Sequence, residues 1–194
     1  GKVSIGGKGL SLDYGQKQGD GARDNMSHKL DDLNIKYSTE MSERQVITLR
    51  TNLYKEDSVQ TYSGLTQAEF ENLGASYNPF KNDRFEAQRT GLSITHDFLV
   101  TDQTTLITSV YYSKFDRDWW RQASTSQDGQ CAALNPSRLA GVVINPDSCN
   151  SIQGRLRSYE TWGIEPRIAV THSLGEFQAG VRLHFEEQNR RQIN

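Results

Sequence analysis

The sequence predicts an all-β protein, specifically a segment of an antiparallel transmembrane β-barrel with about seven strands. Two observations support this prediction. Apolar and polar side chains alternate in seven separate segments, and the connections between these segments alternate between long and short. A period of two in side-chain polarity is typical of strands that place one face against an apolar environment and the other against a polar one.

The alternation recurs along the whole chain. In residues 33–38, for example, Leu33, Ile35 and Tyr37 alternate with polar side chains. We expect one strand in each alternating segment: residues 8–15, 33–38, 47–54, 89–98, 104–115, 161–170 and 177–186. Charged side chains within these segments fall opposite the apolar ones, at Arg50, Arg89, Glu165, Arg167 and Arg182. An arginine on the lipid face near mid-bilayer would cost roughly 2–4 kcal/mol, and the pattern avoids this cost.

The connections show the same regularity. Residues 16–27, 57–84 and 117–157 are long connections, whereas residues 40–44, 101–103 and 173–175 are short ones. Outer-membrane barrels have short periplasmic turns and long extracellular loops. Because every backbone polar group inside a bilayer needs a partner within the protein, such a sheet must close on itself.

Aromatic residues are expected to form two belts at the membrane–water interfaces. The belt near the long loops would contain Tyr14, Tyr54, Phe115, Tyr159, Trp162 and Phe185, and the belt near the short turns Tyr37, Phe98 and Phe177.

Charge also predicts one strand register. If Glu165 lies opposite Arg182, then Trp162 meets Phe185. A slip by two residues would place Arg167 opposite Arg182, and like charges that face each other are destabilising. We therefore expect the first register, which leaves Gly175 just outside a two-residue turn.

Composition excludes several classes of protein. The 194 residues have a mean hydropathy of −0.71, and no apolar run approaches the roughly 18 residues of a membrane-spanning helix. The 22 basic and 24 acidic residues give no support for a nucleic-acid partner. Both ends look cut, so residues 1–194 are expected to be part of one barrel domain of a longer protein.

The two cysteines, Cys131 and Cys149, both lie in the third long connection. A single disulfide in an oxidising compartment fits them better than a zinc site, and two free thiols remain the alternative. In the second long connection, residues 67–73 are expected to form a short helix with Thr66 as its N-cap.

Four strings occur in a specific order: residues 28–36 (HKLDDLNIK), 62–70 (YSGLTQAEF), 82–85 (NDRF) and 162–167 (WGIEPR). With these strings, the chain resembles the barrel of TonB-dependent outer-membrane transporters, most closely the ferric dicitrate receptor type. The resemblance covers most of the chain. It implies a barrel of about 22 strands closed by an N-terminal plug domain that lies outside this sequence.

The resemblance also implies a function. Such proteins import a ferric chelate, ferric citrate or another siderophore, across the bacterial outer membrane, driven by the TonB–ExbB–ExbD complex. The expected partners are therefore the ferric chelate, this complex acting through the plug, and outer-membrane lipid or lipopolysaccharide. The chelate would be cargo, and no resident cofactor or metal is expected.

An anionic chelate requires cations and hydrogen-bond donors that face the outer vestibule, and arginine suits this role because its planar fork holds a carboxylate with two bonds. The candidates at the loop bases are Arg23, Arg84, Arg89, Arg117 and Arg121, together with Trp119 and Trp120. The alternative for each arginine is a solvated loop charge or a salt bridge with a plug residue. The alternative for the tryptophans is one in the belt and one covering the loop.

No catalytic constellation occurs in the sequence, because the four histidines are scattered and no metal-ligand spacing is present. We therefore expect no enzyme. Two other functions remain as alternatives: a passive porin-like barrel, which would conduct ions steadily, and a soluble β-sandwich adhesin, which would dissolve without detergent.

Overall fold

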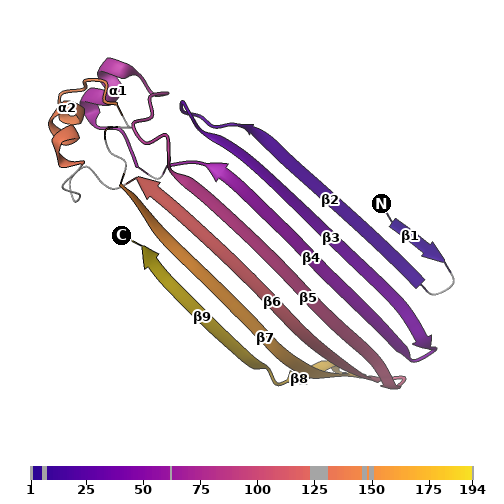
Figure 1. Cartoon of the computed structure of the whole chain (residues 1–194). Helices are drawn as coiled ribbons and strands as arrows, with labels where there is room; N and C mark the ends of the chain where they lie inside the picture. The colour runs from indigo at the N-terminus through magenta and orange to yellow at the C-terminus, as the bar shows by residue number, and fades with distance from the viewer. Residues whose placement is uncertain are drawn as a thin grey trace.

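The computed structural model describes residues 2–5, 8–61, 63–122, 131–145, 148 and 151–193. These residues form one antiparallel sheet in a single layer, with two short helices gathered at one end (Figure 1). The strands are β1 (Lys2–Ile5), β2 (Lys8–Asp20), β3 (Ser27–Ser42), β4 (Gln45–Val59), β5 (Arg84–Thr101), β6 (Thr104–Gln122), β7 (Ile152–His172), β8 (Gly175–Gly180) and β9 (Leu183–Ile193). The helices are α1 (Gln67–Leu73), the 3-10 turn Ala132–Leu134 and α2 (Asn135–Leu139).

The strands follow one another in chain order from β1 to β8, and β9 also pairs with β7. The pairings Arg167 with Gly180 and Ile164 with Leu183 share one register, so β8 and β9 are two parts of one strand interrupted at residues 181–182. The predicted antiparallel sheet with seven long strands is confirmed. The sequence pattern missed β1, a four-residue strand that pairs only with the start of β2.

The predicted register of the last hairpin is confirmed. Trp162 lies opposite Phe185, with ring centroids 4.2 Å apart, and Arg182 Nε is 2.6 Å from Glu165 Oε2. The hairpin turns at residues 173–174, and Gly175 adopts a φ of 140°, a region that favours glycine.

The strand registers give the sheet two chemically different faces. One row across the sheet consists of Leu12, Ile35, Thr51, Leu92, Tyr112, Trp162 and Phe185, and the next of Leu10, Tyr37, Leu49, Ile94, Val110, Ile164 and Leu183. We call the face with these rows the apolar face. The opposite, polar face carries the row Asp13, Asn34, Asn52, Gly91, Ser113, Thr161 and Glu186.

The apolar face covers only the half of the sheet near the short turns. On β7 its side chains run from Trp162 to Val170, which matches the about 9–11 residues of a tilted transmembrane strand. Directly beyond Trp162, the same face carries the ion pair between Lys114 and Glu160, at 3.3 Å. The 21-residue strand β7 therefore continues well beyond the apolar band, toward the long loops.

The extension of the strands beyond the apolar band corrects two predictions. The strands are longer than expected, and the long loops shrink to residues 21–26, 60–83 and 123–151. Beyond the apolar band both faces of the sheet are polar, so the alternation of apolar and polar residues disappears although the strands remain paired. Polar side chains there contact each other across the strands: Tyr14 Oη donates to Asp31 Oδ1 at 2.6 Å. The predicted outer belt is also wrong in part, because the registers place Tyr54, Phe115 and Tyr159 on the polar face.

Candidate ligand-binding site

The second and third long loops pack together at the end of the sheet. Helix α1 begins at a capping box: Thr66 Oγ1 accepts a hydrogen bond from Glu69 N at 3.1 Å, and Glu69 Oε2 accepts one from Thr66 N at 2.8 Å. The predicted helix and its N-cap are thereby confirmed. Since Glu69 is fully buried, its carboxylate requires a further partner.

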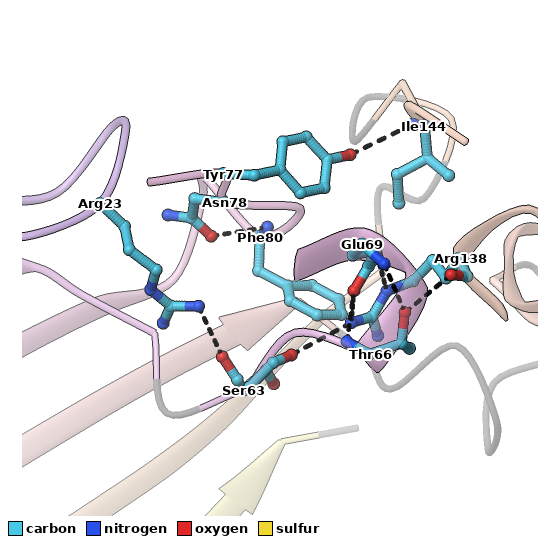
Figure 2. Close-up of polar contacts among 10 residues, drawn as sticks. Arg23, Ser63, Thr66, Glu69, Tyr77, Asn78, Phe80, Arg138 and Ile144 are labelled. Carbon is cyan, nitrogen blue, oxygen red and sulfur yellow. Dashed lines mark hydrogen bonds and ion pairs between the residues drawn. The ribbon is translucent and has the colours of Figure 1, made fainter. Parts of the chain in front are cut away.

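That partner is Arg138 of α2, from the third loop (Figure 2). Its Nε and Nη2 donate to the two oxygens of Glu69 at 2.6 and 2.8 Å, and Nη2 also donates to Gly64 O at 3.1 Å. The guanidinium carbon lies 4.9 Å from the ring centroid of Phe80, which is itself buried. Burial raises the pKa of Glu69, but the hydrogen bonds from Arg138 and Thr66 outweigh it and hold the pKa below its ordinary value.

Backbone contacts extend this packing. Gly141 follows α2 with a φ of 66°, and a Cβ at this position would lie 2.4 Å from Ala68 O of α1. Only glycine therefore allows the third loop to approach the helix this closely. Further along the loop, Ile144 N donates to Tyr77 Oη at 3.2 Å (Figure 2).

The first long loop joins the same assembly through Arg23. Its guanidinium donates to Ser63 O at 3.0 Å (Figure 2) and to Thr61 O at 3.4 Å. Asn78 Nδ2 donates to Asp24 O at 2.9 Å. The structure thus places Arg23, a sequence-predicted ligand residue, in contacts that connect two loops. We call the assembly of residues 21–26, 63–83 and 131–145 the loop cap.

Asp83 lies where the loop cap meets the strands. Its side chain is 1% exposed, accepts a hydrogen bond from Gln122 N at 2.5 Å and is hydrogen-bonded by Thr61. Burial raises the pKa of Asp83 to about 6, although these hydrogen bonds and the nearby Arg121 and Arg23 act in the opposite direction. The folded protein therefore binds a proton at this carboxyl more tightly than the unfolded chain does.

Replacing Asp83 with asparagine is expected to remove a pH dependence of the loop cap. The pKa of Asp83 is about 6 in the folded protein and 3.8 in the unfolded chain. The stabilisation of the folded state by this proton is therefore complete below pH 3.8 and is lost as the pH rises through about 6. The difference corresponds to about 3 kcal/mol. Hydrogen-exchange protection of residues 60–83, corrected for intrinsic exchange, should fall over this range in the native protein and stay flat in Asp83→Asn. The exposed Glu71→Gln is the matched control, and equal pH profiles for all three proteins would contradict the assignment.

Below the loop cap, the polar face carries a group of arginine and aromatic side chains. Arg157 of β7 lies between two other arginines in one row across the sheet. It is directly opposite Arg117 of β6 on one side and Arg190 of β9 on the other. We define the basic aromatic patch as Arg89, Arg117, Arg121, Arg155, Arg157 and Arg190, together with Tyr54, Phe85, Phe115, Trp119 and Tyr159, all placed on this face by the registers.

The aromatic side chains of this patch lie in pairs. The rings of Phe115 and Tyr159 are stacked with centroids 6.1 Å apart, and Phe85 meets Trp119 edge to face at 6.4 Å. Arg89 lies 5.6 Å from the Tyr54 ring centroid. Such surfaces provide flat, apolar contact area beside cations.

The electrostatics of the patch favour an anion. Like charges directly opposite each other in a sheet are destabilising. An anionic group between two arginines adds an attractive contact to each of them, which offsets their mutual repulsion. The Nε of Arg117 is buried and has no hydrogen-bond partner within the part of the chain that the structure describes. Arginine forks that face one another can hold carboxylate or catecholate oxygens by charge-assisted hydrogen bonds.

The other sequence-predicted residues divide between the two faces. Arg89, Arg117, Trp119 and Arg121 belong to the patch, and Arg121 also donates to Gln153 Oε1 at 3.3 Å. Arg84 points to the other side, where it pairs with Asp57 at 2.7 Å and with Glu86 at 3.0 Å. Trp120 lies on that side too, where it covers Gly154; a Cβ there would be 2.8 Å from the indole.

The sequence alone does not indicate Arg155, Arg157 and Arg190 as ligand candidates, because each becomes a neighbour of Arg117 only through the strand register. One signal for Arg157 was available in the sequence. Arg117 and Arg157 are the first and last residues of the predicted third long connection, and the structure places them opposite each other.

The cysteine prediction is tested only in part. Cys131 is fully buried, packs against Leu134 and is disulfide-bonded. Cys149 lies outside the described residues, so the pairing of the two stays a prediction. Among the described residues, no group of acidic, histidine or cysteine side chains is arranged to hold a metal ion. None of the described helices is long and apolar enough to cross a membrane.

The chain is similar to known proteins in its fold. No protein-family model and no curated protein matches the sequence. Among solved structures, the unliganded ferric citrate transporter FecA matches with a TM-score of 0.77 at 20% identity, over 98% of this chain and 25% of that chain. The chain therefore has the fold of the barrel wall of a TonB-dependent transporter.

Two further transporter structures agree. The open form of the ferric-catecholate import receptor Fiu from E. coli K12 matches with a TM-score of 0.72 at 14% identity, over 100% of this chain and 32% of that one. The ferric preacinetobactin receptor BauA from Acinetobacter baumannii matches at 0.68 and 10% identity, over 96% and 27%. The chain thus spans about a quarter to a third of the length of these TonB-dependent transporters.

Proposed function

We propose that the chain forms part of the wall of an outer-membrane, TonB-dependent importer of a ferric chelate, and that the basic aromatic patch contacts this cargo. Ferric citrate and other anionic siderophores are the proposed cargo class. The chain would contribute no catalytic group. The proposed partners of the whole protein are the TonB–ExbB–ExbD complex, acting through a plug, and the lipid and lipopolysaccharide of the outer membrane.

The row formed by Arg117, Arg157 and Arg190 is the observation that carries this proposal. It lies on the polar face, beyond the apolar band and below the loop cap, where a solute entering from the long-loop side would first meet the wall. Each guanidinium can give two parallel hydrogen bonds to a carboxylate, and the neighbouring rings of Phe115 and Tyr159 can cover the apolar parts of a chelate.

The alternative functions make different physical demands. A soluble sandwich requires a second sheet against the apolar face, but the described residues form one sheet, and Ile94 and Val110 remain 43% and 48% exposed. A passive porin requires an open lumen. Steady conductance of the purified full-length protein in a planar bilayer would favour the porin over the importer.

The direct test removes two charges of the patch in the full-length protein. The double variant Arg117→Gln/Arg157→Gln is expected to bind ferric citrate or a ferric catecholate at least tenfold more weakly, since each charge-assisted hydrogen bond contributes about 1.5–3 kcal/mol. Titration calorimetry on purified protein measures this loss. Each single variant is compared with Arg84→Gln, which likewise removes one arginine charge at a similar level but on the opposite face. Equal affinities of the patch variants and Arg84→Gln for every chelate would overturn the assignment of the patch.

A further inference from the structure

Asp83 is a buried carboxyl group at the junction of the loop cap and the basic aromatic patch, with a side chain that is 1% exposed. It directly precedes Arg84, whose strand partner Trp120 directly precedes Arg121. Asp83 and Arg121 therefore lie side by side at the end of the β5–β6 pair, close enough for the arginine to act on the carboxylate. Because Arg121 belongs to the patch, this buried acid is a neighbour of the proposed binding surface.

Asp83 also connects segments that are far apart in the sequence. Its carboxylate accepts a hydrogen bond from Gln122 N, at the end of β6, at 2.5 Å and is hydrogen-bonded by Thr61. Its backbone oxygen accepts a hydrogen bond from Gln60 N at 3.2 Å. Thr61 O in turn accepts one from Arg23 of the first loop at 3.4 Å. A change in the charge of Asp83 therefore acts on the loop cap and on the end of β6 together.

The charge of this carboxyl group depends on opposing effects. In the described part of the chain, the cations of other segments that lower the pKa of Asp83 are Arg121 of β6 and Arg23 of the first loop. Lys81 and Arg84 flank it in its own segment, and Arg84 points to the opposite face. Burial outweighs the attraction to the cations and raises the pKa of Asp83 to about 6.

We propose that Asp83 is a positioning residue for Arg121 that couples the binding of an anionic chelate at the patch to the uptake of a proton. The ionised carboxylate attracts Arg121 and repels an anion that approaches this arginine. When the chelate binds, Asp83 takes up a proton from solvent and becomes a neutral carboxylic acid, so the repulsion ends. The proposal rests on the proposed function, because it concerns the regulation of the same patch.

The coupling between chelate and proton is reciprocal. A nearby negative charge raises the pKa of a carboxyl group, so bound chelate favours the protonated form of Asp83. Protonation therefore strengthens chelate binding by the same factor. A rise of about one unit in the pKa of Asp83 on binding would make the affinity about tenfold higher at about pH 5 than at about pH 8.

Titration calorimetry of the full-length protein with ferric citrate and with a ferric catecholate tests the proton uptake. Repeating each titration in two buffers of different ionisation enthalpy gives the number of protons taken up per bound chelate. At about pH 6.5 the native protein should take up about half a proton more than Asp83→Asn. The exposed Glu71→Gln in the same loop is the matched control and should behave as the native protein does. Protonation of the chelate itself is common to all three proteins and cancels in the comparison.

The affinities separate this role from a structural one. Near pH 7.5, Asp83→Asn should bind the chelate severalfold more tightly than the native protein, because no carboxylate competes for Arg121. Near pH 5 the two proteins should bind equally. If Asp83 merely supported the loop cap, its replacement would weaken binding at every pH.

Infrared spectroscopy provides a second readout that needs no chelate. The C=O stretch of the protonated acid that is absent from Asp83→Asn reports the titration midpoint of Asp83. This midpoint should rise in Arg121→Gln, because the carboxylate loses a nearby cation. In Arg84→Gln, which removes an arginine that points to the opposite face, it should move much less.

Three results would each overturn the proposal: equal proton uptake by the native protein and Asp83→Asn, weaker binding by Asp83→Asn at every pH, or an unchanged infrared midpoint in Arg121→Gln. Binding that is lost in Arg117→Gln/Arg157→Gln but takes up no proton at Asp83 would leave the proposed function standing and overturn this coupling alone. Failure of the native protein to bind either chelate would overturn both.

Discussion

Arg138→Met is expected to destabilise the loop cap by about 3–5 kcal/mol, because it leaves the Glu69 carboxylate buried without its cation. Methionine fills much of the same volume beside Phe80, so the loss reports the charge more than the packing. Hydrogen exchange of residues 66–73 and 135–141 in the full-length protein measures the effect. The barrel strands, which do not depend on this pair, should keep their protection.

A double variant separates the charge from the contact. In Glu69→Gln/Arg138→Met neither buried charge remains, and glutamine can still complete the capping box with Thr66. The double variant should therefore be more stable than Arg138→Met alone. Arg44→Met provides the surface control, because the Arg44–Asp102 pair is exposed and worth at most about 1 kcal/mol. A double variant that is less stable than the single one would contradict the buried-charge explanation.

Val110→Arg is expected to lower the free energy of unfolding of the full-length protein in phospholipid vesicles by roughly 2–4 kcal/mol. Val110 belongs to the second row of the apolar face, near the middle of the apolar band. Urea unfolding followed by tryptophan fluorescence measures the change. Ser113→Arg, three residues away on the polar face, is the control and should lose much less. Equal losses would mean that the apolar face does not contact lipid.

Much of the strand pairing was predictable, because a period of two fixes which residues share a face. The charges of Glu165 and Arg182 were enough to select the observed register of the last hairpin. Arg84 is separated from Leu92 and Ile94 by an even number of residues, so a period of two places it on the apolar face. Its position on the face opposite the patch could therefore also be predicted from the sequence.

The remaining features depend on contacts between distant residues. Glu69 and Arg138 are 69 positions apart, and neither loop shows by its composition that the other will neutralise it. The ends of the strands were missed because polar residues on both faces carry no period. The arginine row required the complete registers of β6, β7 and β9 before its three members became neighbours.

The extension of the strands beyond the apolar band has a consequence for the proposed binding of an anion. The arginine row lies beyond the apolar band of the sheet, where counter-ions of the surrounding medium would reach it. At physiological ionic strength, screening limits its attraction to about 8 Å. Binding of an anion by the proposed patch should therefore act at short range, and its strength should decline as salt is added.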